Sequence, residues 1–131
     1  ALGKTARVPF SDREETDWLY VKDAVKALLM ISEADNLKRR IYNIKGETQT
    51  LGRVAEIVKS MIPNADIRFE PGPTSLSSLY PLVDDGAART ELGWSPSYTI
   101  EHGVKDHLAE ILGSPNPENS AEPAPSPVNS S

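Results

Sequence analysis

The chain has 131 residues, of which 38% are hydrophobic and 25% are charged, the balance of one small globular domain. A net charge of −5 without a basic stripe argues against a nucleic-acid partner. The absence of cysteine excludes disulfide scaffolds and cysteine-ligated metal sites. No apolar run approaches the roughly 20 residues of a membrane helix, and residues 1–15 contain no signal-peptide segment, so we expect a cytoplasmic protein without a membrane partner.

Composition divides the chain at residue 114. Residues 1–113 carry nearly all of the apolar side chains, whereas proline and serine supply ten of the eighteen residues that follow. Prolines prevent regular backbone hydrogen bonding, and this stretch has almost no apolar area to bury. We therefore predict one domain over residues 1–113 and a disordered tail over residues 114–131.

The first half of the domain alternates between strand and helix patterns. Residues 1–17 show no periodicity and predict a loop. Trp18–Val21 predicts a short buried strand, and Arg40–Ile44 predicts a second one. Between them, helical spacing predicts a helix over Asp23–Glu33, in which Asp23 can accept hydrogen bonds from free backbone N–H groups. Its apolar stripe consists of Val21, Ala24, Val25, Leu28 and Leu29.

The second half continues the alternation. Thr50 is expected to cap a strongly amphipathic helix that ends before Pro63, and Ile67–Phe69 predicts a third strand. Residues 71–83 predict a long loop without periodicity. Two further helices are expected: one opens at Asp84-Asp85 and ends at Gly93, and the other is capped by Thr99 and closes at Gly113.

The order of these elements predicts an α/β fold in which helices cover a small, partly parallel sheet. Three short strands make a thin sheet for an independent domain. The strand at residue 18 would need neighbours on both sides, and we expect no segment upstream of it to supply one.

Motifs for catalysis, cofactors and metals are absent from the sequence. No two glycines are separated by one residue, which excludes a GxGxxG turn. His102 and His107 are five residues apart, whereas zinc ligands on one helix face are four apart. Asp84-Asp85 is better explained by helix capping than by metal binding. We therefore predict no catalytic, no cofactor-binding and no metal-binding residue in this chain.

The loop over residues 71–83 is rich in hydroxyl groups, which it carries on Thr74, Ser75, Ser77, Ser78 and Tyr80. Such a loop can border a pocket for a polar ligand, or it can be plain surface. Under the first interpretation, Thr74 and Tyr80 are the candidate substrate-binding residues.

Three segments together resemble the NAD-dependent epimerase/dehydratase family, the extended short-chain dehydrogenases/reductases. TDWLYVKDAVKALLM is similar to the family's aromatic strand, V-x-D and alanine-rich helix. RIYNIKGETQTLGRVAEIV resembles its YN strand–turn–helix, and DDGAARTELGWSPSYTIEHGVKD resembles its closing D-x-x-[AK]-R-x-x-L-G-W-x-P helix pair. The segments occur in the family's order and cover residues 16–112.

The resemblance implies the C-terminal, substrate-side part of an incomplete Rossmann-type fold. It implies a parent enzyme that uses NAD or NADP on a small-molecule substrate, and it allows a homodimer of that parent. The family's glycine-rich turn and Tyr-x-x-x-Lys pair are not in this sequence, so the chain alone is not expected to be active. The alternative is a non-enzymatic, truncated α/β module for binding or assembly.

Two departures from the family bear on the substrate. Members that act on nucleotide-sugars carry an arginine before the aromatic strand, where this chain has Thr16, and another after the third strand, where it has Glu70. Neither residue offers a diphosphate the bidentate donors of arginine. Arg68 could substitute for the missing arginine, or it could pair with Glu70, because the two would share one face of a strand. Other segments resemble the short-chain L-threonine 3-dehydrogenases: YN, PNADIRF and YPLVDD.

Overall fold

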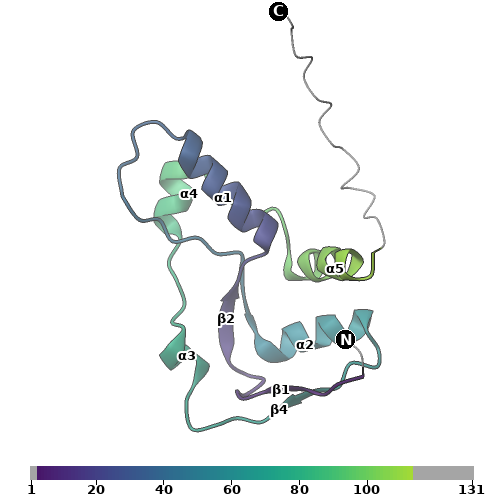
Figure 1. Ribbon diagram of the computed structural model, residues 1–131. Helices are drawn as coiled ribbons and strands as arrows, with labels where there is room; N and C mark the ends of the chain where they lie inside the picture. The colour runs from purple at the N-terminus through teal and green to yellow at the C-terminus, as the bar shows by residue number, and fades with distance from the viewer. Residues whose placement is uncertain (1–2, 114–131) are drawn as a thin grey trace, which may run out of the picture.

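The computed structural model describes residues 3–113, so the tail predicted over residues 114–131 lies outside the described part (Figure 1). The elements follow one another in a mixed α/β order. They are β1 (Ala6–Val8), β2 (Glu15–Trp18), α1 (Val21–Glu33), β3 (Glu47–Thr50), α2 (Leu51–Met61), β4 (Ile67–Phe69), α3 (Leu76–Leu79), α4 (Gly86–Leu92) and α5 (Ile100–Ile111). The α/β class predicted from the sequence is confirmed.

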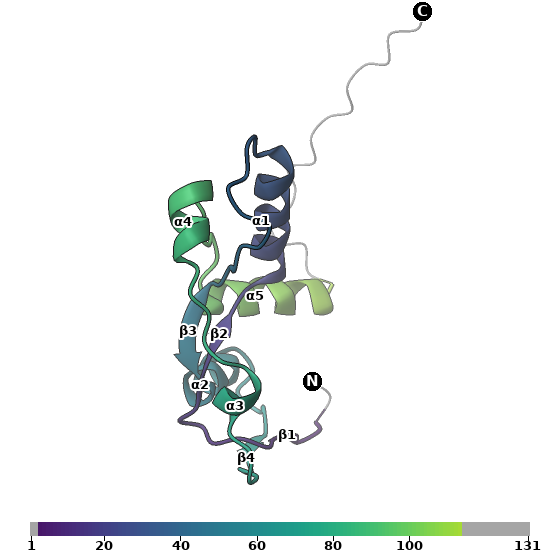
Figure 2. The ribbon, with the colours of Figure 1, turned by 90° about the vertical axis from the view of Figure 1, so that its left-hand side faces the viewer.

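The strands form two separate ribbons instead of one small sheet. β1 pairs with β4 in parallel, and β2 pairs with β3 in antiparallel register, with Trp18 opposite Glu47. Figures 1 and 2 place the β1–β4 ribbon at one end of the molecule and α1 with α4 at the other. The prediction of a loop over residues 1–17 is therefore wrong, because this stretch contains all of β1 and the start of β2.

The strand predicted over Trp18–Val21 begins earlier and ends at Trp18, and α1 starts at Val21. It pairs on one side with β3, which lies downstream, whereas the upstream strand β1 pairs with β4 and does not supply the second neighbour. The strand predicted over Arg40–Ile44 does not form within residues 3–113. A strand requires hydrogen bonds to a neighbour, and no described segment pairs with this one, which leaves Ile41 78% exposed.

One part of the core lies between α1 and α4. Ala27, Ala88 and Trp94 are buried together, and Leu19, Met30, Tyr42, Ile44 and Leu92 pack around them. Small alanines on both helices let the two backbones approach, and the Trp94 indole closes the contact by donating from Nε1 to the Lys45 carbonyl. The apolar stripe of α1 is on its other side.

A second packed region joins α2 and α5, which lie one above the other in Figure 1. Both helices begin as the sequence predicts: the Thr50 hydroxyl accepts from the Arg53 N–H, and the Thr99 hydroxyl accepts from the His102 N–H. The expected C-terminal glycine of α4 is also confirmed, since Gly93 adopts a φ of 67°.

Candidate functional site

The hydroxyl-rich loop over residues 71–83 runs from β4 to α4 and contains a single helical turn, α3, that the sequence does not predict. The Leu76 side chain is buried, whereas residues 77–82 are all exposed. This stretch therefore projects from the body. Among its apolar side chains, Leu79 and Tyr80 have exposed fractions of 52% and 63%.

Two carboxylates from the region of β2 hold the loop. Glu14 accepts the Leu76 N–H at 2.8 Å, and Asp17 accepts the Val83 N–H at 2.7 Å. Asp17 also accepts the Thr48 hydroxyl at 2.5 Å and lies 3.6 Å from the Lys45 ammonium. Sequence reasoning missed both carboxylates, since no local pattern marks residues whose partners are 62 and 66 positions away.

The environment of Asp17 favours its charged form. Burial raises the pKa of this carboxyl, but the hydrogen bonds from Thr48 and Val83 and the charge of Lys45 outweigh burial, so the pKa lies below its ordinary value. Asp17 is therefore a carboxylate at neutral pH and acts as a hydrogen-bond acceptor.

The two candidate substrate-binding residues are both on the exposed surface of this loop. Ser75 contacts the hydroxyls of Ser77 and Ser78 at 3.3 and 2.6 Å, so these three groups satisfy one another. The hydroxyls of Thr74 and Tyr80 make no hydrogen bond within residues 3–113. They are the free hydroxyls of the loop and remain available to a ligand.

An apolar groove of about 300 Å³ lies at the junction of β2, α1 and α5. Its walls include Trp18, Tyr20, Val21, Tyr98, Ile100 and Val104, and its polar lining includes Glu47 and His107. Gly103 lets α5 approach the Tyr20 ring, because a Cβ at this position would come within 3.0 Å of the ring's Cδ2.

A polar cluster fixes Tyr20 beside this groove. The Tyr20 hydroxyl donates to Asp106 at 2.5 Å, and the Lys22 ammonium lies 2.7 Å from the same carboxylate. Burial and the neighbouring Asp106 raise the pKa of Tyr20, and the hydrogen bond to Asp106 raises the pKa of Lys22. Both groups hold their protons at neutral pH, which suits a structural contact and not proton transfer.

Asp23 of α1 and Asp85, the residue before α4, have structural roles. Asp23, in the first turn of α1, is 1% exposed and accepts the N–H groups of Ser97 and Tyr98 at 2.8 and 2.9 Å, which are 74 and 75 positions away in the chain. Asp85 accepts from Arg89 at 2.8 Å and makes no side-chain cap. Within residues 3–113, no group of three or more histidine, aspartate or glutamate side chains could hold a metal ion.

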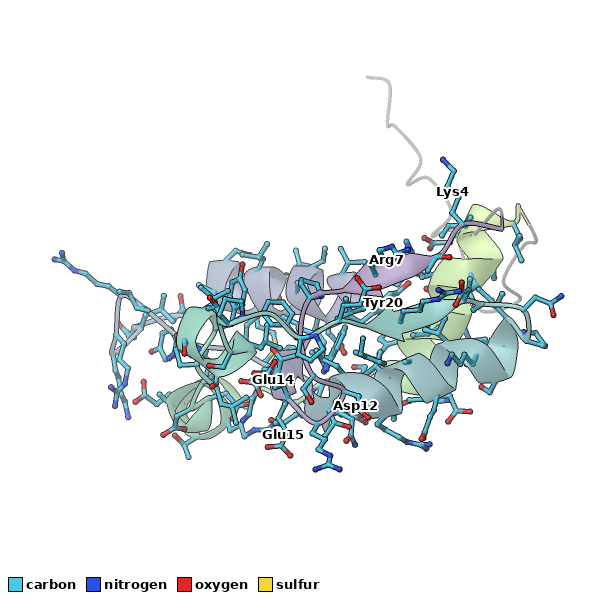
Figure 3. The ribbon with its side chains drawn as sticks, turned by 90° about the horizontal axis from the view of Figure 1, so that it is seen from below. Lys4, Arg7, Asp12, Glu14, Glu15 and Tyr20 are labelled. Atoms are coloured by element: carbon cyan, nitrogen blue, oxygen red, sulfur yellow. The ribbon has the colours of Figure 1, made fainter. Side chains whose placement is uncertain are left out.

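At the β1–β4 ribbon, Arg68 does not form the pair with Glu70 that is one of its two alternatives in the sequence. Arg68 forms two 3.1 Å hydrogen bonds to Asp66, whereas Glu70 pairs with Arg7 of the neighbouring strand. Figure 3 shows Arg7 on β1. Sequence reasoning missed this arginine because β1 was not predicted. Glu70 is thus already neutralised by a cation of the chain.

A second hollow, of about 540 Å³, lies between residues 39–43 and the beginning of α4. Ile41 and Asn43 of the unpaired extended segment line it, together with Asp84 and Thr90.

No helix of the described residues is long and apolar enough to cross a membrane.

No family model matches the chain. Among curated proteins, it is 27% identical over 103 residues to an uncharacterized epimerase/dehydratase of Staphylococcus saprophyticus, a match that covers 74% of this chain and 32% of that protein. The chain thus spans about a third of the length of the curated relatives it matches.

Solved structures give the same result. A GalE-like L-threonine dehydrogenase from Cupriavidus necator, in its holo form, is 28% identical with a TM-score of 0.73, over 83% of this chain and 37% of that one. A dTDP-glucose 4,6-dehydratase from Bacillus anthracis in complex with NAD has a TM-score of 0.68 at 22% identity, over 85% and 35% of the two chains, and shows the fold alone. The resemblance seen in the sequence and its partial extent are both confirmed.

Proposed function

Since this chain matches part of an extended short-chain dehydrogenase/reductase, we propose that it supplies the substrate side of the cleft in an NAD- or NADP-dependent enzyme. In that enzyme the nicotinamide would exchange hydride with a hydroxyl-bearing small molecule. The chain has no glycine-rich turn and no Tyr-x-x-x-Lys pair, so we assign neither cofactor binding nor proton transfer to its residues.

The observation that carries the proposal is the outward apolar face of α1. Val21, Val25, Leu28 and Leu29 recur at helical spacing and are 50–67% exposed. An apolar stripe of this kind on a helix that is packed on its other side ordinarily has a partner. The matched proteins are about three times as long as the matched segment. We therefore infer that, in the complete enzyme, the part of the fold that this chain does not contain packs against this apolar face of α1.

The substrate contacts that we propose lie on the projecting loop. Thr74 and Tyr80 offer free hydroxyls, and Leu79 offers an exposed apolar surface beside them. A hydroxy acid, an amino acid or an uncharged sugar suits this surface. A nucleoside diphosphate suits it less, since Thr16 provides no bidentate donor and Glu70 already occupies Arg7.

A chimera tests the proposal. Residues 3–113 would replace the matching segment of the Cupriavidus necator enzyme, and NAD reduction would be measured with threonine and with related small hydroxy compounds. We expect a folded chimera with substrate-dependent activity, because the transplanted α1 face regains its partner. A folded chimera that binds NAD but oxidises no such compound would contradict the substrate-side role and favour a non-enzymatic binding module.

The chain alone provides the matching control. We expect no NAD binding by calorimetry, because the groups that would hold the pyrophosphate are not in the sequence. Micromolar binding of NAD by the isolated chain would contradict the proposal that this chain contributes to substrate binding and not to cofactor binding.

A further inference from the structure

The segment over residues 76–83, called the arch here, is fastened at its two ends and free between them. Its first residue, Leu76, donates its N–H to Glu14, and its last, Val83, donates its N–H to Asp17. Residues 77–82 are exposed throughout. The side chain of Leu76 is buried and that of Val83 is half-buried, so the two end residues of the arch, called its feet, also pack against the rest of the domain.

The two fastening carboxylates are three residues apart in the chain. Glu14 precedes β2, and Asp17 lies within it. The side chain of Asp17 is 11% exposed, and its orientation is fixed by Thr48 and Lys45, both from the region of the partner strand β3. The β2–β3 ribbon thus sets the position of the Asp17 carboxylate, and Glu14 directly precedes the same ribbon. Each carboxylate holds one end of the arch.

This arrangement matters for ligand binding because the middle of the arch has little else to hold it. Ser77, Ser78 and Leu79 contribute to the single turn of α3, and the exposed side chains of Tyr80 and Leu82 follow. A loop that is already fixed at both ends loses less conformational entropy when it closes on a ligand. Hydrogen bonds from N–H groups to a carboxylate are stronger than those to neutral acceptors.

We propose that Glu14 and Asp17 are positioning residues, which fix the arch in the conformation that presents Tyr80 and Leu79 to the substrate. The substrate contact rests on the proposed function, whereas the fastening of the arch does not. Neither carboxylate needs to touch the substrate. Each acts through a backbone N–H of the arch.

Hydrogen exchange on the full chain tests the fastening. In Asp17→Ala, exchange at the Val83 amide should accelerate by about ten-fold or more, and in Glu14→Ala the same should occur at Leu76. Asp17→Asn and Glu14→Gln retain an acceptor oxygen and should restore much of the protection. Amides of α2 should not change in any of these variants.

The matched control is Glu15→Ala. Glu15, labelled in Figure 3, lies between the two carboxylates in sequence, and its exposed side chain makes no hydrogen bond or ion pair to any residue from 3 to 113. This substitution should leave both feet unchanged. Unaltered exchange at Val83 in Asp17→Ala, or equal acceleration in the arch and α2, would overturn the fastening role.

Kinetics of the chimera test the link to substrate. Asp17→Ala should raise KM by about ten-fold while kcat stays within about two-fold, because an unfixed arch weakens binding and leaves the reacting groups in place. Glu15→Ala should leave both constants unchanged. A fall in kcat at constant KM would overturn the positioning role. An inactive chimera would count against the proposed function, whereas the exchange experiment would still decide the fastening.

Discussion

Helices α1 and α2 carry similar apolar stripes, but only one of them faces the core. In α2, Val54, Ala55 and Ile57 are each at most 8% exposed, and the helix contacts β3 and α5. In α1, Leu28 and Leu29 are 67% and 55% exposed. Helical spacing therefore identifies both helices correctly, but it does not reveal whether the partner of the stripe belongs to the same chain.

The inner side of α1 explains how this helix can hold its place. Asp23 and Ala27 are its buried residues, and they bind the segment after Trp94 and pack against α4. A polar anchor and a small side chain thus replace the usual large apolar contacts. The apolar stripe on the opposite side of α1 thus stays exposed in this chain, and we propose that another part of the complete enzyme packs against it.

The largest expected effect is a direct contrast between the two stripes. Ile57→Ala should lower the free energy of unfolding by about 3 kcal/mol, because it removes buried methyl groups from the α2 contact. Leu28→Ala should change it by less than about 0.5 kcal/mol, because Leu28 is exposed. Urea denaturation of the two variants measures the difference. Equal costs would show that α1 buries its stripe within the isolated chain.

Asp23 tests the inner side of α1. Asp23→Ala should cost about 2 kcal/mol, because two backbone N–H groups lose a buried carboxylate acceptor. Asp23→Asn keeps one acceptor oxygen and should recover part of this loss. Thermal unfolding of both variants provides the measurement, and an alanine variant as stable as the parent would refute the anchoring role.

Gly103 tests the packing of α5 against the chain that enters α1. Gly103→Ala should destabilise the protein by about 1 kcal/mol in net terms, since the new Cβ meets the Tyr20 ring at 3.0 Å and this contact outweighs the better helix propensity. Lys105→Ala, at an exposed position of the same helix, is the control and should be close to neutral. A gain in stability at Gly103 would mean that Tyr20 moves aside freely.

The smallest expected effect is a pH dependence from Asp17, in the ribbon that connects the two helices. Its pKa is lower in the folded than in the unfolded chain, so its contribution is present above the unfolded pKa and is lost as pH falls through the folded one. Stability of Asp17→Asn should therefore depend less on pH in the acidic range than that of the parent. Parallel urea titrations at several acidic pH values measure this, and identical profiles would contradict it.

Local signals predicted α2, α5 and their threonine caps, because caps and amphipathic spacing depend on residues within a few positions of each other. The same reasoning failed for β1, whose partner β4 is about 60 residues away, and for Arg40–Ile44, which has strand-like residues but no pairing partner. Strands are defined by hydrogen bonds to another segment, so pattern alone cannot establish them.

The sequence by itself determined the family resemblance, the helices α1, α2, α4 and α5, and the hydroxyl-rich loop with Thr74 and Tyr80. Only the tertiary structure decided which hydroxyls of that loop are free, and that Glu14 and Asp17 hold its ends. The tertiary structure also decided that the apolar stripe of α1 is exposed and that Glu70 pairs with Arg7. The physical reason is the same in each case: these contacts join groups far apart in the chain, and folding alone brings them within hydrogen-bond or packing distance.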